Sequence, residues 1–196
     1  MSRLATSFVL GYHGCDREDG ERFLAGEEMM VSSEPWHWLG AGVYFWEGDP
    51  LRALEWAQSK AARDACKDPF VIGAVIDLGN CLDLQVRENV ALVRDAYESF
   101  VAMRDKAGLS LPVNKTAKHD KSKDKVLRFL DCAVIDHLYA ASEAAGNAFD
   151  SARGVFGEGE EAFPGSGILS KSHSQIAVRN MTCIKGLFRL RAESGA

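Results

Sequence analysis

The sequence predicts an α+β fold built on a mostly antiparallel sheet, and three observations indicate it. Apolar, strand-like runs open and close the 196-residue chain. Two long stretches with helical periodicity lie between them. Strands and helices do not alternate as they would in βαβ units. No GxGxxG or P-loop motif follows a strand, so a Rossmann or Walker-type nucleotide site is not indicated.

The first part of the chain is predicted to contain two strands and two helices. Residues 7–12 and 41–46 have the apolar character of strands, and a polar helix between them is expected to end near Gly26. Asp49 and Pro50 mark the start of the next helix, as N-cap and first helical residue. That helix is expected to run to about Cys66, with an apolar face of Leu51, Leu54, Ala57 and Ala61.

The middle and the end of the chain complete the predicted sheet. The run 70–78 predicts a buried strand, which residues 80–84 extend after a glycine. Two helices are expected at 87–107 and 125–147, as a helical insertion within a single domain spanning 1–196. Their predicted apolar stripes are Val90, Val93, Tyr97, Phe100 and Val101, and then Leu127, Leu130, Val134, Ile135 and Leu138. The glycine-rich residues 150–171 are predicted to form a loop, and strands at 174–179 and 183–191 close the chain.

Composition excludes several classes of protein. Apolar residues make up 46% of the chain and charged residues 26%, which favours a packed core over disorder. The net charge of −5 argues against a general nucleic-acid coating protein. The five cysteines are scattered, without CxxC spacing, so neither a disulfide framework nor a metal site is indicated. No signal peptide or membrane span is evident. We therefore expect a cytoplasmic protein with no membrane partner.

Three short motifs occur in a telling order. "YHG" contains His13 and Gly14 at the end of the first strand. "GVYF" contains Tyr44 in a glycine-flanked strand, followed by a helix with "ALEWA". "SHSQIAVRN" contains Gln175 in a late strand. In this order the motifs resemble the His-Tyr branch of the ADP-ribosyltransferase superfamily, which includes diphtheria-toxin-like and poly(ADP-ribose)-polymerase-like enzymes.

The resemblance implies a split, mostly antiparallel β core with surrounding helices, and NAD as the substrate. It implies that His13 binds the adenosine-side ribose and that Gly14 presents its backbone to the carboxamide of nicotinamide. Tyr44 would stack on the nicotinamide ring, and Gln175 would bind the ribose next to nicotinamide. Gly42 is expected to let NAD approach the strand closely, because it has no side chain.

Gln175 departs from the glutamate that the superfamily often has at this position. Glutamine can orient a hydroxyl group but cannot act as a general base. The protein would then need a reactive acceptor or another carboxylate, for which the nearest candidates in sequence are Glu158, Glu160 and Glu161. By resemblance, the segment before Gln175 contacts the acceptor, and Arg153 and Glu158 are its candidate contacts.

Ordinary structural roles remain open for several of these residues. Tyr44 is a good strand former and could simply belong to the core. Trp36, His37 and Trp38 could form an aromatic wall over NAD or pack beneath a loop. The lysines of the loop before the second long helix are expected to be solvated, with phosphate contact as the alternative. These are Lys115, Lys118, Lys121, Lys123 and Lys125.

The sequence thus predicts a mono-ADP-ribosyltransferase that modifies a macromolecule, either a protein or a nucleic acid. By resemblance, such a stand-alone domain would be a bacterial toxin or a phage-defence effector, held silent by an antitoxin or inhibitor. Two alternatives stay open: a catalytically silent NAD-binding or interaction module, and an NAD-dependent RNA 2′-phosphotransferase. The last would need basic residues that converge on the cleft.

Overall fold

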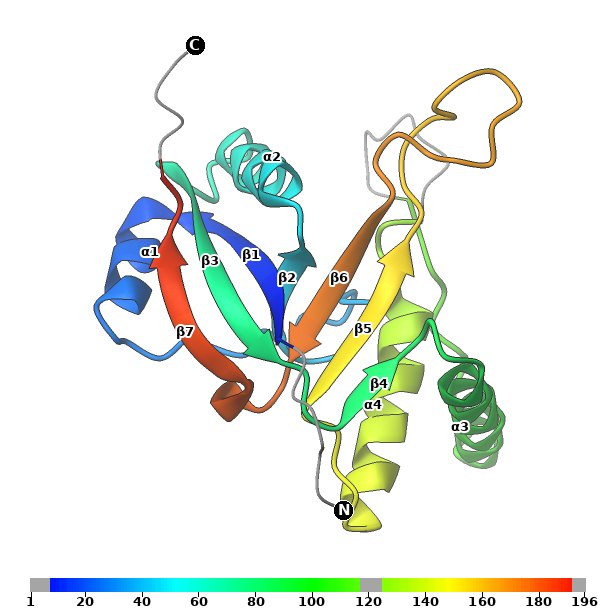
Figure 1. Ribbon diagram of the computed structural model, residues 1–196. Helices are drawn as coiled ribbons and strands as arrows, with labels where there is room; N and C mark the ends of the chain where they lie inside the picture. Colours follow the sequence, from blue (N-terminus) through cyan, green and yellow to red (C-terminus); the bar gives the residue numbers. More distant parts are fainter. Residues whose placement is uncertain (1–7, 117–124, 192–196) are drawn as a thin grey trace.

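The computed structural model describes residues 8–116 and 125–191. Seven strands form one sheet in the order β4-β5-β6-β2-β1-β3-β7 (Figure 1). Every neighbouring pair is antiparallel except β4 and β5, and four α-helices accompany the sheet, which confirms the predicted α+β class. The strands are β1 (Phe8–Asp16), β2 (Val43–Glu47), β3 (Pro69–Asp77), β4 (Cys81–Asp83), β5 (Ser151–Phe156), β6 (His173–Val178) and β7 (Ile184–Arg189).

The sheet is weakly joined in its centre. β1 pairs with β3 along its whole length, from Phe8 to Asp16. Its ladder with β2 has only two residue pairs, Gly11 with Glu47 and Tyr12 with Trp46, and the strands then diverge. β1 is also longer than the predicted strand 7–12, of which Ser7 lies outside the described residues. The extension puts His13 and Gly14 inside the strand, at the point where the two strands separate.

The main core lies between the two halves of the sheet that meet at this junction. Phe45 of β2 and Ile176 of β6 pack against Ile72 and Ile76 of β3, and all four are fully buried. Burial of such aliphatic and aromatic side chains contributes about 1.5–3 kcal/mol each. The packed side chains therefore hold the halves together where backbone pairing is sparse.

Helix α2 (Pro50–Ala61) begins as its sequence predicts. The Asp49 carboxylate accepts a hydrogen bond from the amide of Arg52 at 2.9 Å, and Pro50 is the first helical residue. The predicted apolar face was only partly right: Ala57 is fully buried and Leu54 packs against the core, but Leu51 is 73% exposed and Ala53 is buried instead. Small residues face the sheet because the helix lies very close to β1.

The close approach is greatest at Gly14. A β-carbon added there would collide with the backbone carbonyl oxygen of Ala53 and would lie 3.4 Å from the β-carbon of Ala57. Gly14 is thus required by the packing of α2 on β1. The short helix α1 (Arg17–Leu24) follows β1 and ends before Gly26 as predicted, with Asp16 as its N-cap.

The predicted helical insertion contains α3 (Arg87–Lys106) and α4 (Phe129–Ala144). Figure 1 shows α4 behind β4 and β5, with α3 beside it. In α3 the buried residues are Ala96 and Phe100, whereas Val90 is 49% and Tyr97 39% exposed, so the predicted stripe was only partly right. The stripe is narrower because α3 packs against one helix, α4, and the rest of its surface meets water.

The prediction of a loop over residues 150–171 was wrong at its start. Residues Ser151–Phe156 form β5, which pairs with β4 on one side and β6 on the other. Its sequence, SARGVF, is weakly strand-like because close packing demands small side chains there. Ser151 and Ala152 are fully buried, and a β-carbon on Gly154 would lie 2.6 Å from the indole of Trp38.

Candidate functional site

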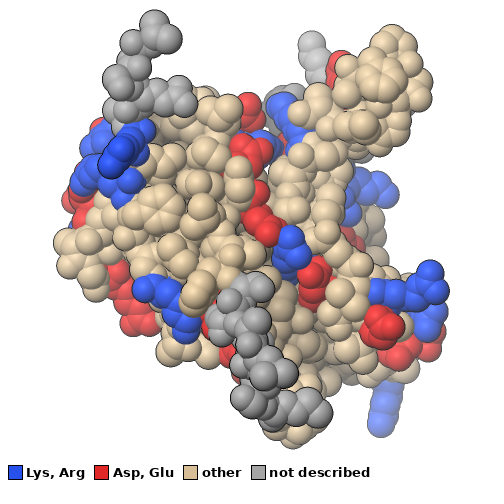
Figure 2. All heavy atoms as spheres, in the orientation of Figure 1, with Lys and Arg blue, Asp and Glu red and all other residues tan. Residues whose placement is uncertain are grey.

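A groove of about 980 Å³ opens where β1 and β2 diverge. One wall is α2, the other is formed by residues 34–38 with the ends of β5 and β6, and Figure 2 shows the surface hollowed between α2 and the segment that follows β5. The groove contains four of the predicted site residues from four different elements or loops, together with Gly42. The predicted residues that line it are His13, Gly42, Tyr44, Glu158 and Gln175.

His13 bridges the gap between the diverging strands. Its Nδ1 lies 2.8 Å from the backbone carbonyl oxygen of Tyr44, so Nδ1 carries the proton and donates it to that carbonyl. Burial lowers the pKa of His13 to about 4, with Lys60 contributing in the same direction. The ring is therefore neutral at pH 7, and its Nε2 is an acceptor fixed in one orientation.

Tyr44 has its hydroxyl group committed to the loop before it. The hydroxyl accepts a hydrogen bond from the Leu39 amide and donates one to the Gly40 carbonyl, both at 2.9 Å. Burial raises the pKa of Tyr44, so the hydroxyl stays protonated. The ring of His37 lies 4.6 Å away, measured between centroids. The ring of Tyr44 is thus the part that can meet a ligand.

Gln175 is oriented by a tryptophan. Its Oε1 accepts a hydrogen bond from Trp38 Nε1 at 2.6 Å, and because an indole nitrogen can only donate, the oxygen must face it. The amide nitrogen then remains as a donor at the floor of the groove. Trp38 in turn packs on Phe156, with ring centroids 5.3 Å apart. For Trp36, His37 and Trp38 the sequence left two roles open, an aromatic wall over NAD or packing beneath a loop. All three line the groove, and Trp38 also packs against Gly154 of β5.

Glu158 is held by a cation. Its carboxylate lies 2.7 Å from the guanidinium of Arg52, and the two side chains are only 18% and 13% exposed. The other two predicted carboxylates, Glu160 and Glu161, are exposed and do not line the groove. Of the three, Glu158 alone is therefore positioned to act on a bound ligand.

Unpartnered polar atoms gather around the groove. Six buried side-chain nitrogen or oxygen atoms of the described residues have no hydrogen-bond partner, and four belong to residues that line it. These four are His37 Nδ1, Trp46 Nε1, Arg52 Nε and His173 Nε2. Buried polar groups are normally satisfied, because an unmade hydrogen bond costs about 1–3 kcal/mol. Four buried nitrogens without a partner therefore belong to residues of the groove wall.

Histidine 173 repeats the arrangement of His13. Its Nδ1 donates to the backbone carbonyl of Lys171 at 2.7 Å, which leaves Nε2 as an acceptor. Burial lowers the pKa of His173, so it too is neutral at pH 7. It precedes Gln175 by two residues on β6, and the two side chains therefore share a face of the sheet.

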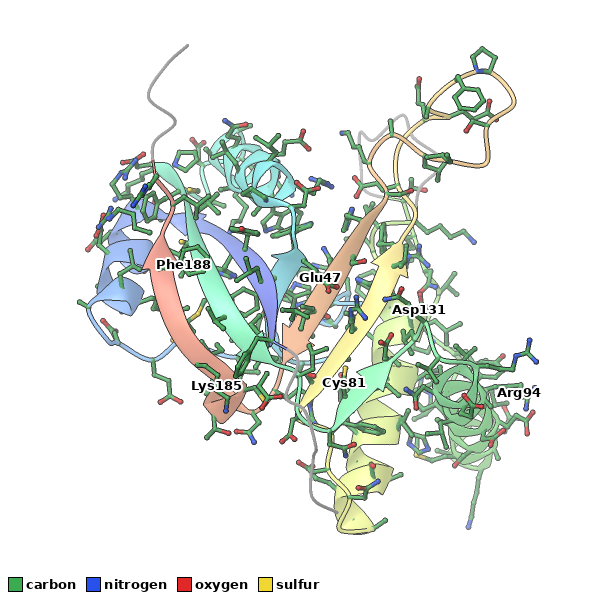
Figure 3. The ribbon with its side chains drawn as sticks, in the orientation of Figure 1. Glu47, Cys81, Arg94, Asp131, Lys185 and Phe188 are labelled. Carbon is green, nitrogen blue, oxygen red and sulfur yellow. The ribbon has the colours of Figure 1, made fainter. Side chains whose placement is uncertain are left out.

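Two predicted site residues, Gly14 and Arg153, do not line the groove, and Gly42 lines it but also packs closely on β6. Gly14 is outside the lining residues, and its missing side chain makes room for α2. Arg153 binds Glu47 at 2.7 Å and Asp83 at 3.1 Å, on the opposite face of the sheet from Trp38. Figure 3 shows Glu47 at the end of β2, beside the central junction. A β-carbon on Gly42 would lie 3.0 Å from that of Ala177.

The residue after the lysine-rich loop and the predicted acceptor segment 150–171 border the same groove. Val126, which follows the lysine-rich loop, lines it together with Phe156 and Lys171 from the segment before Gln175. Of the five lysines singled out in the sequence, Lys118, Lys121 and Lys123 lie outside the described residues. Neither Lys115 nor Lys125 lines the groove.

Sequence reasoning missed the α2 wall. Arg52, Trp56, Lys60 and Arg63 line the groove, and they recur every three or four residues along one side of the helix and its end. That helical spacing was readable from the sequence, but only the fold shows that this side faces the motif residues. Among the described residues, no cluster of three or more histidine, cysteine, aspartate or glutamate side chains could hold a metal ion. None of the described helices has the length and apolar character that a membrane span requires.

Comparison with known proteins gives little beyond this geometry. No family model matches the chain, and no solved structure matches it. An uncharacterized protein of the archaeon Methanocaldococcus jannaschii is 40% identical to it over 45 residues. The matched stretch is 23% of this chain and 21% of the archaeal protein, so the likeness is local.

Proposed function

We propose that this protein is a mono-ADP-ribosyltransferase that uses NAD to modify a macromolecule. The observation that carries the proposal is the meeting of His13, Tyr44 and Gln175 in one groove, although they are far apart in sequence. Their strands β1, β2 and β6 are neighbours in the centre of the sheet. The polar and aromatic lining of a groove of about 980 Å³ supports a ligand with both ring and polar groups.

In the proposed reaction the bond between nicotinamide and C1′ of its ribose breaks, and nicotinamide leaves with the electron pair. A nucleophilic oxygen or nitrogen of the acceptor forms the new bond to C1′, and its proton passes to water. The transition state resembles an oxocarbenium ion, so orientation and electrostatics supply most of the rate enhancement. His13 Nε2 accepts a hydrogen bond from a ribose hydroxyl, and the ring of Tyr44 stacks on nicotinamide.

Gln175 limits what the enzyme can do. Its amide orients a hydroxyl group of the ribose beside nicotinamide but takes no proton. Glu158 is paired with Arg52, so its carboxylate is already engaged by a cation. The proposal is therefore transfer of single units to an acceptor that is already nucleophilic, rather than growth of poly(ADP-ribose) chains.

The test is release of nicotinamide from labelled NAD. His13→Ala removes the fixed acceptor and Tyr44→Ala removes the stacking surface, so each should lower the rate at least tenfold, as the loss of a positioning group does. Because Tyr44 also holds residues 39 and 40, Tyr139→Phe is the matched control. The Tyr139 hydroxyl donates to the Leu39 carbonyl at 2.7 Å, and Tyr139 does not line the groove.

The outcomes separate the enzyme from the silent module. Release that is lost in both alanine variants and kept in Tyr139→Phe supports the transferase. Saturable NAD binding without release, lost in the same variants, would instead establish a binding module of the same fold. Absence of both binding and release would refute the proposal.

A second candidate, NAD-dependent RNA 2′-phosphotransfer, is favoured by one observation. Arg52, Lys60 and Arg63 line the groove, which supplies the converging basic residues that phosphate recognition requires. A short RNA with an internal 2′-phosphate, incubated with NAD, should lose that phosphate if this reaction occurs. The roles of toxin or phage-defence effector, restraint by an antitoxin and a cytoplasmic location stay predictions.

A further inference from the structure

All four tryptophans of the chain line the groove. They come from three segments: Trp36 and Trp38 from the loop before β2, Trp46 from β2, and Trp56 from α2. Trp46 is buried at the floor, and the other three are half-buried. Tryptophan is the largest flat apolar side chain, and such a gathering at an open groove is typical of a site for aromatic ligands.

The α2 wall places cations beside an indole. Arg52, Trp56 and Lys60 are four residues apart, so they stand on one side of the helix at steps of about 6 Å. Arg63 follows just beyond the helix, with its guanidinium 5.8 Å from the centre of the Trp56 ring. One indole, Trp56, therefore stands between cations on this wall.

Most of these cations lack an acidic partner. Arg52 is paired with Glu158 and Glu55. No carboxylate of the described residues lies within 4 Å of the cationic groups of Lys60, Arg63 or Lys171. Lys60 instead donates to the backbone carbonyl of Gly14 at 3.3 Å, next to His13. An anionic ligand would thus meet three cations that have no paired carboxylate, in a groove that Glu34, Glu55 and Glu158 also line.

Aromatic rings that alternate with cations are the features that bind single-stranded nucleic acids. Bases stack on the rings without regard to sequence, and the cations follow the phosphates. The sequence offered no such pattern in the lysine-rich loop, because the aromatic and basic residues come together only in the fold. The groove volume of about 980 Å³ lies at the upper end of the usual range for ligand pockets, about 300–1,000 Å³.

We propose that the acceptor is a single-stranded nucleic acid, held along the α2 wall with a base on Trp56 and phosphates on Lys60 and Arg63. This inference rests on the proposed function for its chemistry, since the nucleophile is then an oxygen or nitrogen of a nucleotide. A duplex is excluded by the same geometry, because its bases are already stacked and cannot reach an indole. A protein acceptor is disfavoured, because a gathering of tryptophans with unpaired cations does not by itself select a peptide.

The first experiment measures binding without NAD. A mixed-sequence RNA 12-mer, and the DNA of the same sequence, are titrated into the protein while tryptophan fluorescence is followed. We expect saturable quenching by both single strands and little by the matching duplex. Because two cations, Lys60 and Arg63, contact phosphates, log K should fall with log [salt] with a slope of about −1.4, at roughly 0.7 per phosphate.

Variants locate the bound strand. Trp56→Ala should weaken binding roughly tenfold or more, the usual cost of losing one stacking platform. Arg63→Glu is the second variant, since Arg63 is exposed and its replacement leaves the core intact. It should weaken binding and reduce the salt slope. Arg94→Glu is the charge-matched control, because Arg94 is 70% exposed on α3, which lies well away from α2 (Figure 3).

The second experiment follows the label from NAD that is labelled in its adenosine part, with the same 12-mers and with a cell extract. Label on the oligonucleotide, lost in Arg63→Glu and kept in Arg94→Glu, supports the proposal. Label only on nuclease-resistant, protease-sensitive material would overturn it in favour of a protein acceptor. Quenching that Arg94→Glu weakens as much as Arg63→Glu would overturn the proposed site. Nicotinamide release is measured in parallel, so failure of the acceptor proposal is distinguished from failure of the NAD reaction.

Discussion

At the scale of single residues, His13 owes its chemistry to the different surroundings of its two ring nitrogens. Nδ1–H is bound to the Tyr44 carbonyl, at the place where the ladder between β1 and β2 has stopped. The imidazole thus satisfies a carbonyl that the diverging strand no longer reaches. The same hydrogen bond fixes the tautomer of the ring and leaves Nε2 as an acceptor. One side chain therefore satisfies a backbone carbonyl and offers an acceptor to a ligand.

The lowered pKa of His13 predicts a dependence of stability on pH. Its folded-state pKa of about 4 lies below the ordinary value of 6.5, so the unfolded chain binds the proton more tightly. The stabilising contribution is therefore complete above about pH 6.5 and is lost as the pH falls toward 4. It amounts to about 3 kcal/mol at most, from about 1.4 kcal/mol per pKa unit. Urea unfolding measured from pH 7.5 to pH 4 gives this slope.

The His13→Gln variant isolates the contribution, because glutamine can still donate to the Tyr44 carbonyl but does not titrate. Burial also lowers the pKa values of His37 and His173, which add to the slope in the same direction. The difference between the two proteins is thus the quantity to compare. A wild-type slope equal to that of His13→Gln would show that His13 is not held neutral by burial.

At the scale of elements, α2 performs two tasks with two of its sides. Ala53 and Ala57 allow it to lie against β1, while Arg52, Trp56 and Lys60 face the groove. Close docking of the helix therefore sets the width of the groove. The glycine that makes docking possible, Gly14, belongs to the motif that suggested NAD binding. Its presence has a packing explanation that is independent of any ligand.

Gly14→Ala tests this packing. The new methyl group would meet the backbone carbonyl of Ala53, which cannot rotate away as a side chain could, so the helix must shift. We expect a loss of about 1–3 kcal/mol in the free energy of unfolding, as for other overpacked sites. Gly186→Ala is the control, because a β-carbon there has no neighbour within 4 Å. Equal stability of the two variants in urea unfolding would contradict the close docking.

At the scale of the whole molecule, the two halves of the sheet are joined by side chains more than by backbone. The two residue pairs between β1 and β2 leave the core around Phe45 as the main connection. The same divergence opens the groove, which lies where β1 and β2 no longer form ladder hydrogen bonds. His13 lies at this seam, with its ring centre 5.7 Å from that of Phe45.

Phe45→Ala tests the connection. Phe45 is fully buried, so its truncation should cost about 3–5 kcal/mol, the usual range for a buried aromatic residue. Phe163→Ala is the matched control, since Phe163 is 60% exposed on the segment after β5, and we expect a change within about 0.5 kcal/mol. Chemical denaturation compares them. A cost below 1 kcal/mol for Phe45→Ala would show that the halves are held together in another way.

The sequence by itself determined the α+β class, the start of α2 and most of the strands. Local signals suffice for these, because an N-cap aspartate or an apolar run acts over a few residues. It failed for β5, whose small residues read as a loop, and for the exposed side chains Leu51, Val90 and Tyr97. Those outcomes depend on which neighbour covers each face, and periodicity alone does not contain that information.

The residues of the candidate site also fall into those that the sequence identified and those that only the fold revealed. The order of "YHG", "GVYF" and "SHSQ" along the chain was enough to select His13, Tyr44 and Gln175. Only the tertiary structure shows that Trp56 and Arg63 line the same groove as these residues. Only the tertiary structure shows that Arg153 pairs with Glu47 and Asp83 on the other face of the sheet. The physical reason is that a motif records residue types at fixed spacing, whereas a groove is made by the docking of elements that are distant in the chain.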